Sequence, residues 1–427
     1  MRGAHLKQRF RGGSRMRSFI LFLMVSAVIG NSAYADSAIS VGNPQDFYRP
    51  FNTADIPVEK MQQWPYYKYV SAHWDQFVLT STAKLGAATQ PAKLASGEEI
   101  DLNSEFQDGQ SYLENLLQSQ TKGFLVLREN QVLAEFYDNG YNLGDTNLLQ
   151  SSSKTYAGVI THKLVDAGQL ELDAKVETIL PDFEGTTIGA ATVEQVLDMT
   201  SGANSLSDYH TLGSPGQLWE IEIGLQPGQA QGHVNAIKAE VKTAEPGEKW
   251  QYTDKNTDTL ALIAEKVTGK PYAELMTELA NEIGANDESS IVLTNDGTAS
   301  PSYGISVSTR DYALFHQWMA QGKAPQSFYD SVTDVSKDLI QGAGLGQLFG
   351  SFGHDVTYGS QTYYIAEHNV LFSFGSFGQL GFSDLDSGIV VVNQQDWVTN
   401  GEVDKLEDTI NRSLAIINAL RTSSLIR

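Results

Sequence analysis

The sequence predicts an α/β protein in which both ends of the chain form one domain and a mostly helical domain is inserted between them. Strand patterns occur at 123–127 and 132–136, helical patterns dominate from about 186 to 290, and strand patterns then return before a long C-terminal helix. This order is typical of a sheet that distant segments build together, with helices packed against it. The expected segments are an N-terminal extension at 36–110, an α/β domain at 111–185 and 290–427, and a helical domain at 186–289.

The first 35 residues have the pattern of a secretory signal peptide. Basic residues between Arg9 and Arg17 precede an apolar run from Phe19 to Ile29, and residues 33–35 (Ala-Tyr-Ala) fit a cleavage site. Because the apolar run is too short to span a bilayer, we expect cleavage after Ala35 and export, to the periplasm of a bacterium. A retained N-terminal anchor is the alternative.

The composition disfavours several classes of partner and cofactor. The formal charge of −22 becomes −28 once residues 1–35 leave, because they hold six basic residues and no acidic ones. No polybasic stretch then remains, so binding to nucleic acid or to anionic membranes is not expected. The sequence has no cysteine, which excludes disulfides, thiolate catalysis and cysteine-ligated metals. Without a cysteine for lipid attachment, we expect no stable membrane anchor after signal cleavage.

The elements follow from apolar periodicity and turn residues. Gly123–Leu127 and Val132–Phe136 predict a hairpin across a turn at 129–130, after a short helix at 108–120. An amphipathic helix is expected from Ser151 to Asp166. Further helices are expected at 193–199, 236–241, 257–268, 272–283 and 402–420, and further strands at 289–293, 363–365, 371–374 and 389–392.

The motif Ser-x-x-Lys occurs three times, and its position distinguishes the copies. A lysine three residues after a serine lies on the same face of a helix, where it can take the hydroxyl proton. At a helix N-terminus the macrodipole also favours an anionic serine and lowers the proton affinity of the lysine. Ser81–Lys84 precedes a loop and Ser119–Lys122 ends a helix, whereas Ser151–Lys154 opens a long one. We therefore predict Ser151 as nucleophile and Lys154 as its base; a serine-rich cap with a surface lysine is the alternative.

Tyr252 is the second predicted catalytic group. It stands between the turn at Pro246-Gly247 and a predicted helix. A tyrosine can relay a proton when a nearby cation lowers its pKa, and Lys154 is expected to supply that cation. Tyr137–Asn139 also reads Tyr-x-Asn, but its Asp-Asn-Gly continuation indicates a turn. A packed aromatic side chain before a helix is the alternative for Tyr252.

These motifs, in this order, resemble the serine β-lactamase, DD-peptidase and esterase superfamily on its class C side. Within it, the chain is most similar to the nylon-oligomer (6-aminohexanoate-dimer) hydrolase-like proteins. The resemblance covers roughly residues 110–420 and implies a β-lactamase-like antiparallel sheet flanked by helices, with the inserted mostly helical domain. The segments that carry it are 123–127, 151–154, 196–202, 252–258 and 304–311.

The third motif of the superfamily, Lys-Thr-Gly or His-x-Gly, is changed in this chain. Two Ser-Phe-Gly registers are available, and Ser373-Phe374-Gly375 fits the spacing to the next strand better than Ser376-Phe377-Gly378. The resemblance then implies that the backbone N–H groups of Ser151 and Ser376 form the oxyanion hole. A glycine-rich strand bend is the alternative for either register.

The changed motif bears on the substrate. Ser373 and Phe374 supply no cation for a substrate carboxylate, so we expect a small neutral ester or amide rather than a penicillin. Asp254 stands where the superfamily usually has asparagine; it either holds Lys154 charged or bonds toward Lys249. Tyr209 resembles a substrate-contacting tyrosine of nylon-hydrolase loops, with a core or loop aromatic as the alternative.

The sequence thus predicts an exported serine hydrolase that works through an acyl-enzyme on Ser151, without a metal or an organic cofactor. His162, His210 and His368 have no acidic partner at a suggestive spacing, and we interpret them as structural or surface residues. Two other functions stay open. One is a β-lactamase or DD-peptidase, and the other is a catalytically inert envelope protein that keeps the fold.

Overall fold

The computed structural model describes most of the chain, from residue 56 onward. The predicted signal peptide and its cleavage after Ala35 lie outside the described residues, as do residues 36–55 of the extension, Asn139 and His210. The described ranges are 56–97, 100–138, 140–204, 209, 211–399 and 401–424.

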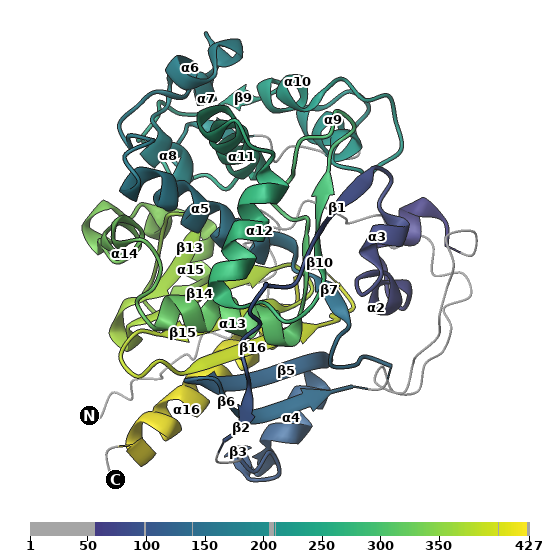
Figure 1. Cartoon of the computed structure of the whole chain (residues 1–427), viewed down its shortest axis with the longest axis vertical. Helices are drawn as coiled ribbons and strands as arrows, with labels where there is room; N and C mark the ends of the chain where they lie inside the picture. Colours follow the sequence, from purple (N-terminus) through teal and green to yellow (C-terminus); the bar gives the residue numbers. More distant parts are fainter. Residues whose placement is uncertain are drawn as a thin grey trace, which may run out of the picture.

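The sheet at the centre of the described chain has eight strands, in the order β12-β13-β14-β15-β16-β5-β6-β2. All neighbouring strands are antiparallel except β2 and β6. Because β16 pairs with β5, the early and late parts of the chain close one sheet, as Figure 1 shows. The strands are β2 (Ala95–Ser96), β5 (Thr121–Arg128), β6 (Gln131–Tyr137), β12 (Val356–Gly359), β13 (Thr362–Ile365), β14 (Val370–Gly375), β15 (Gln379–Asp384) and β16 (Val390–Gln395).

Helices cover both faces of this sheet, and strand β5 shows why. Successive side chains of a strand point to opposite faces. Leu125 and Leu127 join the core that contains α5 (Lys154–Asp166) and α13 (Thr309–Ala320). Phe124 and Val126 join the opposite core, against α4 (Tyr112–Gln118) and α16 (Val403–Ser424). This confirms the predicted α/β class, with an antiparallel sheet between helical layers.

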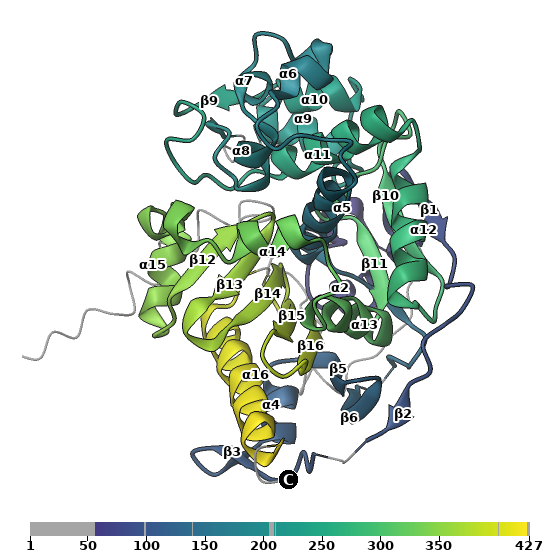
Figure 2. The same ribbon diagram turned by 60° about the vertical axis from the view of Figure 1, so that its left-hand side comes forward.

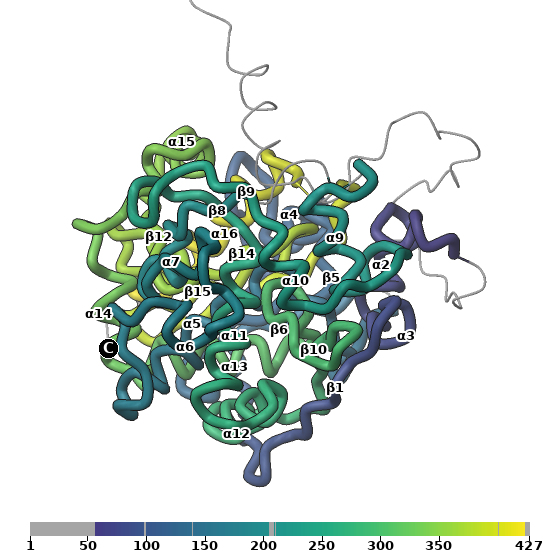
Figure 3. The backbone as a smooth tube through the Cα atoms, turned by 90° about the horizontal axis from the view of Figure 1, so that it is seen from above, coloured from purple at the N-terminus to yellow at the C-terminus, as the bar shows by residue number. Residues whose placement is uncertain are grey.

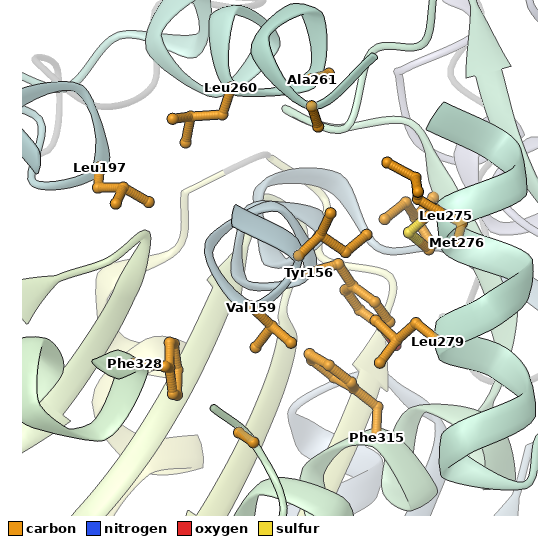
Figure 4. Close-up of a cluster of buried hydrophobic side chains, with 14 of the residues drawn as sticks. Tyr156, Val159, Leu197, Leu260, Ala261, Leu275, Met276, Leu279, Phe315 and Phe328 are labelled. Atoms are coloured by element: carbon orange, nitrogen blue, oxygen red, sulfur yellow. The ribbon is translucent and has the colours of Figure 1, made fainter. Parts of the chain in front are cut away.

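Helix α5 lies at the centre of the helical part. Figure 4 shows Tyr156 and Val159 of α5 surrounded by side chains from five other helices. Tyr156 stacks on Phe315 of α13 with ring centroids 3.7 Å apart. The helices from α6 to α11 form the lobe at the top of Figure 2. They are α6 (Val176–Ile179), α7 (Thr187–Ala190), α8 (Val193–Leu197), α9 (Pro215–Glu222), α10 (His233–Lys238) and α11 (Asp254–Thr268). Helix α12 (Tyr272–Ile283) lies below this lobe, on the right of Figure 2, and α14 (Gln326–Val332) and α15 (Gly344–Ser351) follow later in the chain.

A second, four-stranded sheet connects the N-terminal extension to the rest. Its order is β1-β10-β11-β7, so strand β1 of the extension pairs with β10. Helices α2 (Tyr66–Val70) and α3 (Trp74–Phe77) lie beside β1 along one side of the molecule (Figure 3). The strands are β1 (Ser81–Leu85), β7 (Thr146–Leu148), β10 (Ser289–Leu293) and β11 (Ile305–Ser308), and two short pairs are β3 (Glu105–Gln107) with β4 (Gln110–Ser111) and β8 (Ala203–Asn204) with β9 (Val241–Lys242).

The predicted elements differ from the observed ones mainly at their ends. The helix predicted from residue 108 begins at Tyr112, because Gln110–Ser111 pairs with β3 and Ser111 caps the helix. The helix predicted from Ser151 begins at Lys154, after the 3-10 turn η4 (Gln150–Ser153). The domain boundaries stay a prediction, since the helical lobe and the sheets share one continuous core around α5.

Candidate active site

Ser151 lies in the turn η4, and the two residues that follow it in this turn are anchored to neighbouring strands through their hydroxyls. The hydroxyl of Ser152 donates to the carbonyl of Gln379 on β15 at 2.6 Å. The hydroxyl of Ser153 accepts from the amide of Ile305 on β11 at 3.2 Å. Both serines are fully buried, whereas Ser151 is only half-buried. The turn therefore fixes the backbone and leaves the Ser151 hydroxyl accessible.

Lys154 makes three short contacts in the buried space below Ser151. Its Nζ lies 3.1 Å from Ser151 Oγ, 2.5 Å from Asp254 Oδ1 and 2.5 Å from the carbonyl oxygen of Ser302. A lysine ammonium has three N–H donors, so these acceptors saturate it. The structure thus brings together Ser151, Lys154 and Asp254, from η4, α5 and the first turn of α11.

Two opposing effects set the pKa of Lys154. Burial lowers the pKa, because a charged amine loses its hydration. The carboxylates of Asp254 and Asp258 raise it, and the net direction is downward. A buried lysine that gives up its proton more easily than usual is suited to act as a base.

A loop anchored by Asp258 holds the carbonyl of Ser302 in place. Fully buried Asp258 on α11 accepts from the amide of Ser302 at 3.2 Å and from the hydroxyl of Ser300 at 3.0 Å. Trp219 Nε1 donates to the same carboxylate at 3.2 Å, and His233 Nε2 lies 3.2 Å from it. Helix α11 thereby supplies both Asp254 beside Lys154 and the anchor of the facing loop.

Tyr252 reaches Ser151 from the segment just before α11. The amide of Gln251 donates to the carbonyl of Met199 at 2.7 Å, which ties this segment to the end of α8. The phenol lies close enough to Ser151 for that hydroxyl to lower its pKa, and the centre of the ring lies 4.8 Å from Lys154 Nζ. The three predicted catalytic side chains therefore converge on one point.

The pKa expected for Tyr252 is wrong in direction. The sequence predicts that Lys154 lowers the pKa of Tyr252, but burial and the negative charge of Asp254 raise it well above its usual value. The Ser151 hydroxyl offsets this only in part. At neutral pH Tyr252 is a protonated phenol, which can donate a proton.

The first Ser-Phe-Gly register lies on strand β14, and its glycine touches the nucleophile turn. A Cβ on Gly375 would sit 2.2 Å from the carbonyl of Leu149 and 3.0 Å from the amide of Ser152. Only glycine allows so close an approach of two backbones. Ser376 directly follows Gly375, so its amide is brought to the same end of β14 as the turn η4.

The Ser373 side chain does not line the site, contrary to expectation. It is fully buried and hydrogen-bonded to Tyr312 Oη at 2.6 Å and to His316 Nε2 at 2.9 Å, both on α13. Phe374, on the other face of β14, is half-buried, with its ring 6.5 Å from that of Trp397. The alternation of side chains along the strand explains why these two residues point apart.

Tyr209 is buried close to the acidic side of the site. The charges of Asp254, Glu220 and Tyr252 act on its phenol, although burial is the main reason for its raised pKa. Glu220 is itself buried, and burial raises its pKa to about 8. Tyr209 also packs in the cluster of Trp219 and Tyr303, so it belongs to the core as well as to the neighbourhood of the site.

The described candidate histidines do not take part in this arrangement. His162 is buried between the hydroxyls of Ser327, 2.9 Å from Nδ1, and Ser360, 2.8 Å from Nε2. Burial lowers its pKa to about 4. His368 lies at the far end of β14, beside Glu367.

Comparisons with known proteins agree with this geometry. The beta-lactamase family model matches residues 148–408, more than half of the chain. This chain belongs to the beta-lactamase family. It is therefore a serine hydrolase by family, in agreement with the superfamily that the motifs indicated.

Two kinds of relative illustrate the range of the beta-lactamase family. A 6-aminohexanoate-dimer hydrolase of Paenarthrobacter ureafaciens is 27% identical over 293 residues, which are 67% of this chain and 73% of that protein. A proposed 6-aminohexanoate-dimer hydrolase of Bacillus anthracis has a TM-score of 0.77 at 20% identity, covering 88% of this chain and 99% of that one. Simvastatin synthase of Aspergillus terreus has a TM-score of 0.55 at 15% identity, covering 71% and 95%. The two solved structures show the shared fold alone.

Sequence reasoning missed several groups that support the site of this beta-lactamase-family chain. Ser302 contributes only its backbone carbonyl, which no side-chain pattern reveals. Asp258 lies one turn after Asp254 on α11, a spacing that places both on one helix face and could have suggested it. Tyr67 of the extension is a third omission: its hydroxyl accepts from Gln150 of η4 at 2.9 Å, and its ring stacks at 3.9 Å on Phe377, in the turn after Gly375.

Proposed function

We propose that this chain hydrolyses small ester or amide substrates through an acyl-enzyme on Ser151, with Lys154 and Tyr252 as the proton-transfer groups. The observation that carries the proposal is the approach of Lys154 Nζ to 3.1 Å from Ser151 Oγ, with the ring of Tyr252 4.8 Å from the same Nζ. A base within hydrogen-bond distance of a serine is the requirement for activating it.

The first step transfers the proton of Ser151 to Lys154 while Oγ attacks the substrate carbonyl. For this, Lys154 must be unprotonated, and burial favours that state. Tyr252, held as a neutral phenol, then donates its proton to the leaving alkoxide or amine, and the proton on Lys154 restores the phenol. Water cleaves the acyl-enzyme by the reverse sequence, and Ser151 recovers its hydrogen.

The backbone amides of Ser151 and Ser376 are the proposed oxyanion donors. The close approach of Gly375 to the turn η4 supports this, since it brings the end of β14 against the nucleophile. Removing one such donor typically costs about 3–4 kcal/mol of transition-state stabilisation.

The charges near the site favour an uncharged or cationic substrate over an anionic one. Asp254 lies beside Ser151, paired with Lys154, and β14 offers Ser373 where the superfamily has a cation. A substrate carboxylate would meet no partner there. We infer that a small neutral ester or linear amide suits the site better than a penicillin.

We also propose that the protein is exported after cleavage behind Ala35. The pattern of residues 1–35 supports this, and detection of a mature N-terminus at Asp36 in a periplasmic fraction would test it. None of the described helices is long and apolar enough to cross a membrane.

A fluorophosphonate probe tests the nucleophile directly. We expect the wild-type protein to be labelled at Ser151 and Ser151→Ala to remain unlabelled, while Ser152→Ala, if folded, keeps the label. An unreactive wild-type protein would favour the inert envelope protein. In parallel, hydrolysis of p-nitrophenyl esters and aminohexanoate oligomers should exceed that of nitrocefin and D-Ala-D-Ala peptides; the reverse order would identify a β-lactamase or DD-peptidase.

A further inference from the structure

A group of metal-ligating side chains lies at the open end of the β12–β13 hairpin. The strands pair antiparallel with Val356 opposite Ile365, so the residues just before β12 meet the residues just after β13. This register brings His354 beside Glu367 and His368, which belong to the 3-10 turn η8 (Ala366–His368). One ligand atom from each residue lies within 4.8 Å of the other two.

The tautomer of His354 suits a cation between these side chains. Its Nε2 lies 3.0 Å from Asn411 Oδ1 on α16, an acceptor that fixes the ring hydrogen on Nε2. Nδ1 faces Glu367 Oε1 at 3.4 Å, and this carboxylate oxygen also accepts a hydrogen bond from the backbone amide of Asp355 at 3.2 Å. Nδ1 and Oε1 are too far apart for a good hydrogen bond. A cation between them, a metal ion in place of a proton on Nδ1, would bind both atoms.

We propose that His354, Glu367 and His368 bind a divalent transition-metal ion, with zinc as the best match. Zinc binds imidazole nitrogen and carboxylate oxygen at about 2.0–2.2 Å, so two ligand atoms on a tetrahedral ion are about 3.4 Å apart. The observed separation of Nδ1 and Oε1 has this value. To reach the same ion, His368 needs only a small side-chain movement, and its position at a partly exposed surface leaves room for it. A water molecule would supply the fourth ligand.

The surroundings favour a cation at this place. Arg421 is the nearby positive charge, but Asp384 and Asp386 pair with it. Two carboxylates thus pair with this guanidinium, and Glu367 adds a third negative charge among the proposed ligands. Asn411 acts on the metal through His354, as outer-shell acceptors of ligating histidines usually do.

The proposed ion stabilises the fold and takes no part in the reaction. The site lies at the Val370 end of β14, whereas Gly375 and the nucleophile turn lie at the other end. Five residues of strand separate the two ends, a distance of about 17 Å. A zinc ion here would join the loop before β12, the turn η8 and helix α16, and so close the open end of the outermost hairpin of the sheet.

Metal uptake by the full chain, purified without an affinity tag and stripped with EDTA, tests the site. We expect the wild-type protein to bind one zinc ion in calorimetry and metal analysis, and zinc to raise its Tm. Cobalt should give the visible absorption of a four-coordinate ion. His354→Gln and Glu367→Gln should each abolish both effects, and Asn411→Leu should weaken zinc binding about 10-fold.

A second histidine provides the matched control. His73 is partly buried beside α3, its ring stacked on Tyr69 and its Nδ1 2.8 Å from that residue's carbonyl oxygen, so His73→Gln should leave zinc binding unchanged. Ester hydrolysis should not depend on zinc, and therefore a failure of the proposed activity leaves this test intact. The proposal is overturned if the wild-type protein takes up no zinc, or if Glu367→Gln, a change at a largely exposed position, binds it as well as the wild type.

Discussion

Lys154 meets Ser151, Asp254 and Ser302 with all three of its N–H groups, and this has a consequence for its role as a base. A saturated ammonium has no lone pair, so Lys154 must give up a proton before it can accept one from Ser151. Burial favours the loss, and the carboxylate of Asp254 opposes it. The aspartate at this position therefore sets the pH at which the base becomes available.

Asp254→Asn should move the acid limb of the kcat/KM profile to lower pH. The carboxylate stabilises the charged form of Lys154, so its removal lowers the pKa of the amine further. A nearby opposite charge typically accounts for one to three pH units, and we expect a shift of about one unit or more. Glu288→Gln, which removes an exposed partner of Lys84, is the control and should leave the profile in place. An acid limb that stays at its wild-type position in Asp254→Asn would rule out Lys154 as the titrating base.

The residue types at the site could be predicted from the sequence, but their electrostatics could not. Spacing and helix position singled out Ser151, Lys154 and Tyr252, and the structure brings these three side chains together. The direction of the Tyr252 pKa was missed because burial outweighs the neighbouring cation, and burial depends on segments far away in the sequence. The orientation of Ser373 was missed because it depends on which face of β14 the helix α13 covers.

The contact between strand β14 and the turn η4 sets the geometry of the site. Leu149 and Ser152 on the turn leave no room for a side chain on Gly375. A methyl group there would push the strand away from the nucleophile by a large fraction of an ångström or more. Catalysis is sensitive to displacements of this size.

Gly375→Ala should therefore reduce both stability and activity. Overpacking of this kind typically costs about 1–3 kcal/mol in the free energy of unfolding, and kcat should fall because the oxyanion donor moves with β14. Gly350→Ala is the matched control, since that glycine lies in α15 and a Cβ on it would meet nothing within 4 Å. It should be neutral or stabilising by up to about 1 kcal/mol. Equal unfolding curves and rates for the two variants would contradict the close approach.

Some element positions were predictable from local pattern, whereas several elements were missed, among them helices α9, α13, α14 and α15 and strands β1, β7 and β11. The helix Tyr272–Ile283 and the strand Ser289–Leu293 agree with their predicted ranges, because periodicity and turn residues define them locally. Strands β12 and β15 were missed. The residues of both are buried throughout, so they show none of the alternation that marks a half-exposed strand. Pairing with neighbours from elsewhere in the chain defines them instead.

A buried ion pair joins three distant parts of the molecule. Lys122 on β5 lies 2.7 Å from Asp396 after β16 and 2.6 Å from Ser71 Oγ of the extension. Lys122 and Asp396 are both about 98% or more buried. The N-terminal extension is therefore attached to the main sheet at the point where the two ends of that sheet meet.

Lys122→Met should destabilise the whole protein. Removing one partner of a buried pair leaves the other charge uncompensated and typically costs about 3–5 kcal/mol. Lys84→Met is the control: its pair with Glu288 is largely exposed, and such pairs contribute at most about 1 kcal/mol. Urea unfolding should show a large fall of the midpoint for the first variant and little change for the second. Similar midpoints would mean that the buried pair does not hold the extension in place.

The pairing of β5 with β16 has a consequence for the order in which the protein is made. A ribosome delivers Ser151 and Lys154 long before it delivers β14, and the sheet that carries β14 cannot close until β16 has emerged. Contacts of such wide sequence separation form late in folding. The nascent chain thus holds the proposed nucleophile before the strand that faces it exists, and the proposed site is complete only when synthesis is almost finished.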